Sequence, residues 1–93
     1  MLPNFTQINE MISNAGYRRS TSARKIYTDD ESVLLVYDYE HRRKYDMFSV
    51  YLDEDKNVQY AEFTKVTQDK ETRKLTSKVF CINNISDLNK YIG

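Results

Sequence analysis

Apolar residues near the start of the chain recur at intervals of three and four. This spacing places them on one face of a helix. The residues in the pattern are Phe5, Ile8, Ile12 and Ala15. Asn4, with Gln7 three residues later, is a favourable helix N-cap, and Gly16 suits the left-handed turn that ends a helix. The pattern therefore predicts an amphipathic N-terminal helix.

The middle of the chain carries short runs of β-branched and aromatic residues, which are typical of strands. Residues 32–39 begin with a continuous apolar run and predict a central strand, whereas residues 23–28 predict an edge strand. Three further runs, at 45–53, 58–67 and 75–82, are separated by charged segments of hairpin-loop length. We therefore expect an antiparallel β-meander of four to five strands.

The last residues of the chain, 83–93, predict a short C-terminal helix. Asn84 is a good N-cap, and Asp87 in the first turn favours the helix dipole. The residues expected on its apolar face are Ile85, Leu88 and Ile92. Because the sheet is the only surface large enough to receive two apolar helix faces, both helices should cover the same side of it. The expected fold class is α+β, with the order α-β-β-β-β-β-α.

Composition favours one small folded domain over residues 1–93. The chain is 40% hydrophobic and 13% aromatic, which supports a packed core. Fourteen basic and fourteen acidic residues cancel, so no field of one sign attracts the whole molecule to a polyanion. Any binding driven by charge must therefore be local.

Cysteine usage and the N-terminal sequence both favour a reducing compartment. Cys81 is the single cysteine, which excludes an internal disulfide, and its apolar neighbours predict a buried thiol. The N-terminus lacks the features of a signal peptide, and no run approaches the roughly 20 apolar residues of a membrane span. We expect a soluble protein in the cytoplasm of a bacterium or an infected host cell.

Several catalytic and cofactor chemistries are poorly supported. Only two glycines are present, so a glycine-rich phosphate loop is excluded. His41 is the single histidine and is interpreted as a solvated loop residue. Residues 53–64 begin like a calcium loop, but Val58 stands where that loop needs glycine and Thr64 where it needs a bidentate carboxylate. We expect no cofactor, no metal and no catalytic residues.

One enzymatic alternative is a metal-dependent nuclease. Asp38, Glu54 and Lys56 match the residue types with which such enzymes hold magnesium and orient water. The Glu-x-Lys pair falls in a turn where a strand is wanted, and such a triplet is expected by chance in a chain this charged. This alternative is therefore weak.

A second alternative is a nucleic-acid-binding accessory protein. Basic clusters that can contact phosphate lie at residues 18–19, 24–25 and 42–44, and tyrosines between them can stack on bases. Acidic residues at 29–31, and Asp38, Glu40 and Asp46, lie near these clusters in sequence, so the net attraction to a polyanion should be small.

The tyrosines suggest a different surface. If Phe48, Val50 and Leu52 face the helices, alternation places other aromatic residues on the open face of the sheet. The residues expected on this open face are Tyr37, Tyr39, Tyr45, Met47 and Tyr51, with Arg42 and Arg43 at its rim. Tyrosine and arginine are enriched at interface hot spots, so this face predicts a docking surface for another protein. A homodimer contact is the alternative.

Two acidic groups complete the predicted partner-binding residues. They are Asp29, Asp30 and Glu31, and Asp53, Glu54 and Asp55. They are interpreted either as solvated turns or as mimics of phosphates that occupy the nucleic-acid groove of a larger protein. In size and composition, but in no motif, the chain resembles small phage or mobile-element inhibitors, including anti-CRISPR proteins. The sequence therefore predicts a non-enzymatic protein-binding module, and a nucleic-acid-handling enzyme is one class of partner that fits it.

Overall fold

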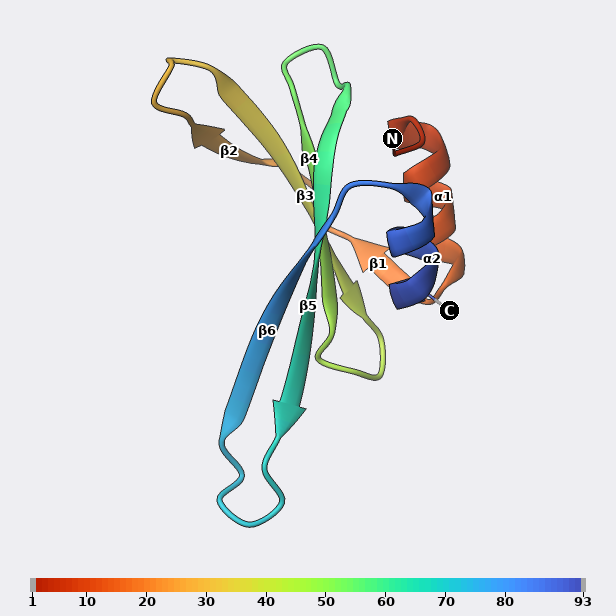
Figure 1. Ribbon diagram of the computed structural model, residues 1–93, viewed down its shortest axis with the longest axis vertical. Helices are drawn as coiled ribbons and strands as arrows, with labels where there is room; N and C mark the ends of the chain where they lie inside the picture. The colour runs from red at the N-terminus through yellow and green to blue at the C-terminus, as the bar shows by residue number, and fades with distance from the viewer. Residues whose placement is uncertain (1, 93) are drawn as a thin grey trace.

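One antiparallel sheet runs through the molecule, and both helices pack on the same face of it (Figure 1). The computed structural model describes residues 2–92. The elements in chain order are α1 (Phe5–Asn14), β1 (Tyr17–Arg19), β2 (Arg24–Tyr27), β3 (Val33–His41), β4 (Met47–Leu52), β5 (Val58–Gln68), β6 (Leu75–Ile82) and α2 (Ile85–Ile92). The predicted α+β fold, with both helices on one face, is confirmed.

Strands β2 to β6 form the expected meander, in which each strand pairs with the next in the chain. The structure adds one short strand, β1, which lies on the same edge as β2. β1 pairs with the C-terminal part of β3, and β2 pairs with its N-terminal part. β3 is therefore a central strand, as predicted, and β6 forms the opposite edge of the sheet.

The N-terminal helix has the caps that its sequence predicts. The Gln7 backbone N–H donates to Asn4 Oδ1 at 2.9 Å, and Gly16 has a φ of +99°. A Cβ at Gly16 would also lie 3.1 Å from His41 Nε2, so space as well as backbone conformation favours glycine there. Ile8 and Ile12 are fully buried, which confirms the predicted apolar face.

The C-terminal helix is capped by Asn84, whose Oδ1 accepts from the Asp87 backbone N–H at 2.9 Å. Leu88 is fully buried and Ile92 partly buried, as the sequence predicts. Ile85 does not follow the prediction, since it is 46% exposed. It is the first residue of the helix, where the chain is still turning back from β6.

Tyr91 takes up the apolar contact on α2 that the predicted face omitted. Its ring stacks on Phe63, at a centroid distance of 5.0 Å, and on Phe80, at 5.3 Å. Deeper in the core, the Phe48 ring lies 4.8 Å from both Tyr17 and Phe63. Aromatic rings therefore supply much of the buried contact area in this small core.

The β5–β6 hairpin extends beyond the helices and forms the narrow lower part of the molecule (Figure 1). The long axis of the molecule measures 45 Å. Every residue of β6 except Ile82 is exposed, including Leu75 and Val79. The outer part of the hairpin, residues 65–68 and 75–78, is thus held mainly by its own cross-strand pairs. Nearer its base, Phe63 and Phe80 pack against Tyr91 of α2.

Candidate functional site

The pairing register decides which tyrosines lie on the open face. Tyr39 pairs with Phe48, and cross-strand partners have side chains on the same face of a sheet. Phe48 faces the helices, so Tyr39 and Tyr37 face them too. The prediction that these two tyrosines lie on the open face is wrong.

Both tyrosines are engaged on the helix side. Tyr39 is fully buried and donates from its hydroxyl to Asn9 Oδ1 at 2.7 Å, and burial raises the pKa of this phenol. Tyr37 stacks on Phe5 with ring centroids 5.2 Å apart. A signal in the sequence was available: Asp38 alternates with these tyrosines, and a carboxylate is disfavoured on the face that helices cover.

The aromatic residues that do occupy the open face are Tyr51 and Tyr60, which are direct cross-strand partners. Their rings stack with centroids 4.3 Å apart, and both residues are partly buried. The Tyr51 hydroxyl donates to Glu62 Oε1 at 2.5 Å. Burial and, to a smaller extent, this hydrogen bond raise the pKa of Tyr51. The prediction that Tyr51 and Met47 lie opposite Phe48 is confirmed, while the sequence reasoning missed Tyr60.

An ion pair covers the centre of the open face. Arg24 Nε lies 2.6 Å from Asp38 Oδ2, and Arg24 Nη2 donates to Asp38 Oδ1 at 2.9 Å. Ser49 donates to the same carboxylate at 2.8 Å. The hydrogen bonds from Arg24 lower the pKa of Asp38 despite its partial burial. Val36, between the cross-strand partners Arg24 and Tyr51, is fully buried although no helix covers it.

Apolar side chains continue from this centre toward one end of the sheet. Ile26 and Leu34 are cross-strand partners on the open face and are only partly buried. Tyr27, at the end of β2, pairs with Val33 and so lies on the other face of the sheet, where it is 75% exposed. These residues were not among the predicted binding residues, because the edge strand has poor alternation and its pairing with β3 is not visible in the sequence.

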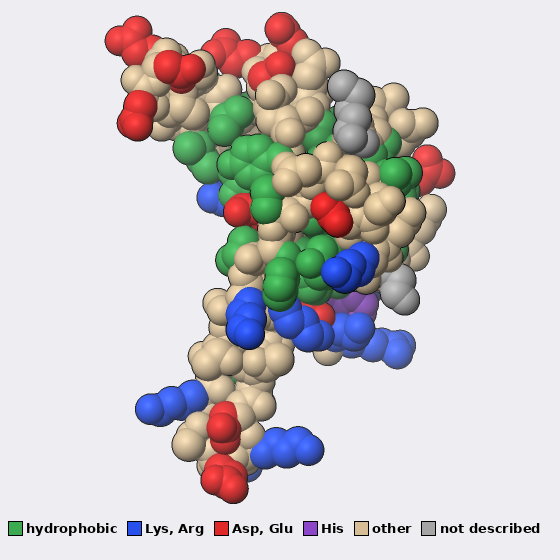
Figure 2. Space-filling model, in the orientation of Figure 1, with side chains coloured by type: hydrophobic (Ala, Val, Ile, Leu, Met, Phe, Trp, Pro, Cys, Tyr) green, Lys and Arg blue, Asp and Glu red, His purple; other side chains and the backbone are tan. Residues whose placement is uncertain are grey.

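The two acidic groups lie at this same end of the molecule. Residues 29–31 connect β2 to β3, and residues 53–55 lie in the turn after β4. Leu35, near the start of β3, pairs with Leu52 at the end of β4. The β2–β3 and β4–β5 connections therefore leave the sheet at the same end of the strands (Figure 1). Acidic side chains gather there at the top of Figure 2. We call these six carboxylates, at residues 29–31 and 53–55, the acidic end.

Hydrogen bonds within the turns keep part of the acidic end ionised. Thr28 and Ser32 donate to Asp30, which lowers the pKa of its carboxyl. Asp53 Oδ1 accepts from the backbone N–H groups of Asp55 and Asn57, each at 2.9 Å, and these bonds lower the pKa of Asp53. Glu54 and Asp55 are exposed. The negative charge is therefore fixed in place on ordered turns.

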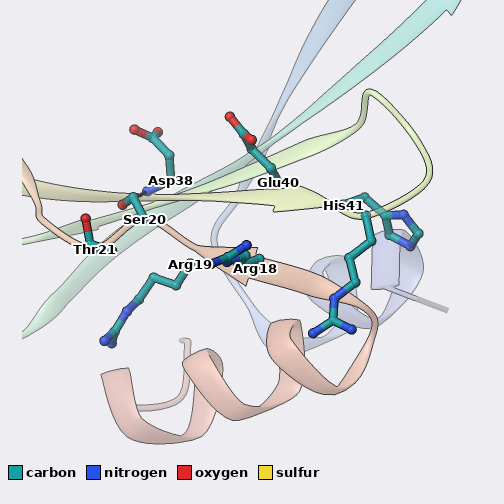
Figure 3. Close-up of a pocket in the computed structure, with 8 residues that line it drawn as sticks. Arg18, Arg19, Ser20, Thr21, Asp38, Glu40 and His41 are labelled. Atoms are coloured by element: carbon teal, nitrogen blue, oxygen red, sulfur yellow. Dashed lines mark hydrogen bonds between the residues drawn. The ribbon is translucent and has the colours of Figure 1, made fainter.

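The predicted residues Arg42, Arg43 and Tyr45 lie at the other end, in the β3–β4 connection. All three are exposed, Tyr45 at 69%. An open depression of about 540 Å³ runs from this connection along β1, between Arg18, Ser20, Asp38 and His41 (Figure 3). Apart from Tyr37 and Tyr39 on the helix face and Tyr51 on the open face, the predicted partner-binding residues thus lie at two opposite ends of the sheet.

Two further expectations are corrected. His41 is the last residue of β3 and is partly buried, with its ring 4.8 Å from Tyr17 and its Nδ1 accepting from the Arg43 backbone N–H at 3.0 Å. It is therefore not a solvated loop residue. Cys81 is exposed, because the open face of β6, where it pairs with Glu62, has no covering element.

The nuclease residues are not brought together. Asp38 pairs with Ser49 in the middle of the sheet, whereas Glu54 and Lys56 lie in the turn beyond β4. Within residues 2–92, no group of three or more His, Cys, Asp or Glu side chains is placed to hold a metal ion. Over the same residues, no helix is long and apolar enough to cross a membrane.

Comparison with known proteins finds no family model, no curated protein and no solved structure that matches this chain.

Proposed function

We propose that this protein is a non-enzymatic binding module that docks on a larger protein through the acidic end and the adjoining open face. The observation that carries the proposal is the placement of both acidic turns at one end of the strands, beside Ile26 and Leu34, which are only partly buried. A partly exposed apolar patch with a charged rim is the usual anatomy of a protein interface.

The charge of the acidic end specifies the kind of partner. Six carboxylates stand on two neighbouring turns, and Lys56 is the one base within these turns. Such a surface is complementary to a basic groove, and grooves of this kind hold the phosphates of nucleic acids. The proposed partner is therefore a nucleic-acid-handling protein, whose groove the acidic end occupies in a stoichiometric complex.

The open face supplies the second contact. Tyr51 and Tyr60 form a stacked pair, and aromatic rings of this kind bury large area at low entropic cost. The ion pair between Arg24 and Asp38 holds the neighbouring surface in a fixed shape. A pre-ordered surface loses less conformational entropy on binding than a mobile one does.

The experiment compares the protein with charge-reversed variants as bait for proteins of its source organism or host. Glu54→Lys with Asp55→Lys reverses two exposed carboxylates of the acidic end, and Glu10→Lys with Glu71→Lys makes the same change in charge elsewhere. We expect the first pair to lose a captured partner that the second pair retains. Size-exclusion chromatography of the purified components should then show a stable complex of fixed stoichiometry.

Tyr60→Ala tests the aromatic contact separately. Loss of the complex with Tyr60→Ala but not with the reversed carboxylates assigns binding to the rings alone and removes the phosphate mimicry. A complex that none of these variants weakens would show that docking occurs elsewhere, and the proposal would then be wrong.

A further inference from the structure

A basic surface lies at the end of the body opposite the acidic end. Three neighbouring depressions share His41 in their linings and follow one another around the end of β3. Besides Arg19, whose guanidinium lies over the Tyr37 ring, six exposed cations line them: Arg18, Arg42, Arg43, Lys44, Lys65 and Lys90. We call these six residues the basic band. Blue side chains gather below the body in Figure 2.

The acids that lie close to these cations in sequence do not neutralise the band. Residues 29–31 are at the opposite end of the sheet. Asp38 forms an ion pair with Arg24, which is outside the band. Asp46 is 4% exposed and is bonded to Lys65 Nζ at 3.2 Å and to the Val66 backbone N–H. Glu40, opposite Arg18, is the one exposed carboxylate in the linings.

The cations of the band are also largely free of ion pairs. Among the residues that the structure describes, ion pairs within 4.0 Å join only Arg24 to Asp38 and Lys65 to Asp46. Within residues 2–92, five of the six band cations therefore have no carboxylate partner, although the whole chain has no net charge. Separation of the two signs in space creates a local field that the composition does not reveal.

Aromatic rings stand among these cations. Tyr45 is 69% exposed in the same connection as Arg42 and Lys44. Phe80, at 36% exposure, and the partly buried Tyr91 line the depression that contains Lys44, Lys65 and Lys90. A positively charged track with exposed rings is the arrangement with which proteins hold single-stranded nucleic acid, since every base has a face that can stack.

We propose that the basic band binds single-stranded nucleic acid through its phosphates, with Tyr45 and the Phe80–Tyr91 pair as stacking surfaces for bases. An acidic protein segment would use the cations but would leave the rings without a specific role. The acidic end of a second copy would do the same. The rings therefore favour the nucleic acid over both other occupants.

The direct test is fluorescence anisotropy with a labelled oligodeoxythymidylate of about 12 nucleotides, a length within the range of such sites. We expect binding at about 50 mM salt that weakens steeply toward about 200 mM. If three to five phosphates are contacted, the slope of log K against log salt should lie between about −2 and −3.5. Absence of binding at the lower salt concentration would overturn the proposal.

Matched variants locate the site. Arg42→Glu with Lys44→Glu reverses two cations of the band, and Lys25→Glu with Lys70→Glu makes the same change at exposed positions outside it. We expect the first pair to weaken binding by roughly tenfold or more and the second by roughly threefold or less. Equal losses from the two pairs would reduce the effect to the overall charge and would contradict a localised site.

Tyr45→Ala separates stacking from charge. It should weaken binding of the oligodeoxythymidylate by roughly tenfold and leave binding of an abasic oligomer of the same length nearly unaffected.

Two other occupants of the basic band give different results. Equal affinity for polyglutamate would identify the occupant as an acidic protein. Self-association at low salt, abolished by Glu54→Lys with Asp55→Lys, would identify it as a second copy. Either result would overturn the proposal. The outcome is independent of the proposed protein docking, which uses the opposite end.

Discussion

The two faces of the sheet bury their side chains by different means. On the helix face, Tyr39 and Phe48 are fully buried by apolar contacts among the strands and helices. On the open face, Val36 is equally buried without a helix, between its cross-strand partners Arg24 and Tyr51. Burial on one face comes from packing between layers, and on the other from polar side chains held by hydrogen bonds. The two faces should therefore respond differently to substitution.

The largest effect is expected from Phe48→Ala. Phe48 is fully buried and its ring contacts Tyr17 and Phe63, so truncation leaves a cavity in the centre of the core. We expect the free energy of unfolding to fall by about 3–5 kcal/mol, a large part of the stability of a small domain. Urea unfolding followed by circular dichroism measures it. Met47→Ala, the neighbouring position on the partly exposed open face, should cost about 1 kcal/mol or less; equal losses would contradict the contrast between the faces.

Sequence pattern predicts the helix face well because apolar periodicity is the direct consequence of burial against another layer. Ile8 and Ile12 show this: their spacing placed them on the buried face, and the structure confirms it. The caps at Asn4 and Asn84 are equally local, since each involves a backbone N–H only three residues away. Such features need no knowledge of distant parts of the chain.

The orientation of Tyr39 depends on the pairing register, which local pattern does not determine. The connection between β3 and β4 closes with His41 N–H donating to the Asp46 carbonyl at 3.4 Å. A shift of one residue in this register would exchange the faces of all the side chains of one strand relative to the other. The turn length therefore decides whether Tyr39 joins Phe48 in the core. The five turn residues, 42–46, are all charged or polar, and their sequence does not show where the turn begins and ends.

The candidate surfaces were predictable in composition but not in arrangement. The sequence shows six carboxylates in two groups and a run of cations at 42–44. Only the sheet topology places both acidic groups at one end and the cations at the other. The bond between Arg24 and Asp38 joins residues 14 positions apart through the pairing of β2 with β3, so it too was not visible beforehand.

The open face should be most sensitive at Asp38. Asp38→Ala removes the carboxylate that accepts from Arg24 and Ser49 and releases the side chain that covers Val36. We expect a loss of about 1–2 kcal/mol in the free energy of unfolding, since Arg24 is half exposed and water screens the ion pair. Urea unfolding measures the loss, and Lys25→Ala, which changes an exposed neighbouring cation, should have little effect. An unchanged free energy of unfolding in Asp38→Ala would show that the ion pair does not order this face.

The same ion pair should make stability depend on pH. The pKa of Asp38 in the folded protein lies below its ordinary value of 3.8, chiefly because of the Arg24 hydrogen bonds. Its contribution is therefore present above pH 3.8 and is lost as the pH falls through the folded pKa. The difference in unfolding free energy between wild type and Asp38→Asn should be largest near neutral pH and vanish in acid. Other carboxyls with lowered pKa, such as Asp30, are common to both proteins and cancel. A difference that stays constant down to about pH 2 would contradict this linkage.

Two hydroxyl deletions compare the faces at similar chemistry. Tyr39→Phe removes a fully buried hydroxyl that donates to Asn9, and Tyr51→Phe removes a partly exposed one that donates to Glu62. We expect a loss of about 1 kcal/mol for the first and about 0.5 kcal/mol or less for the second, because water can replace the donor only on the open face. Thermal and urea unfolding of the two variants provide the comparison. The reverse order would mean that the open-face hydrogen bond is the less replaceable of the two.

The smallest effect is expected where neither means of burial operates, in the outer half of the β5–β6 hairpin. Leu75, which pairs with Gln68 at the outer end of the hairpin, is 56% exposed, so Leu75→Thr should change the free energy of unfolding by less than about 0.5 kcal/mol. Hydrogen exchange offers a sharper measurement, since amides in poorly packed segments exchange through local opening rather than global unfolding. We expect the amides that pair residues 66–68 with 75–77 to exchange much faster than those that pair β3 with β4. Equal protection would show that the hairpin unfolds only with the helix-packed body, and the distinction between packed and self-supported strands would not hold.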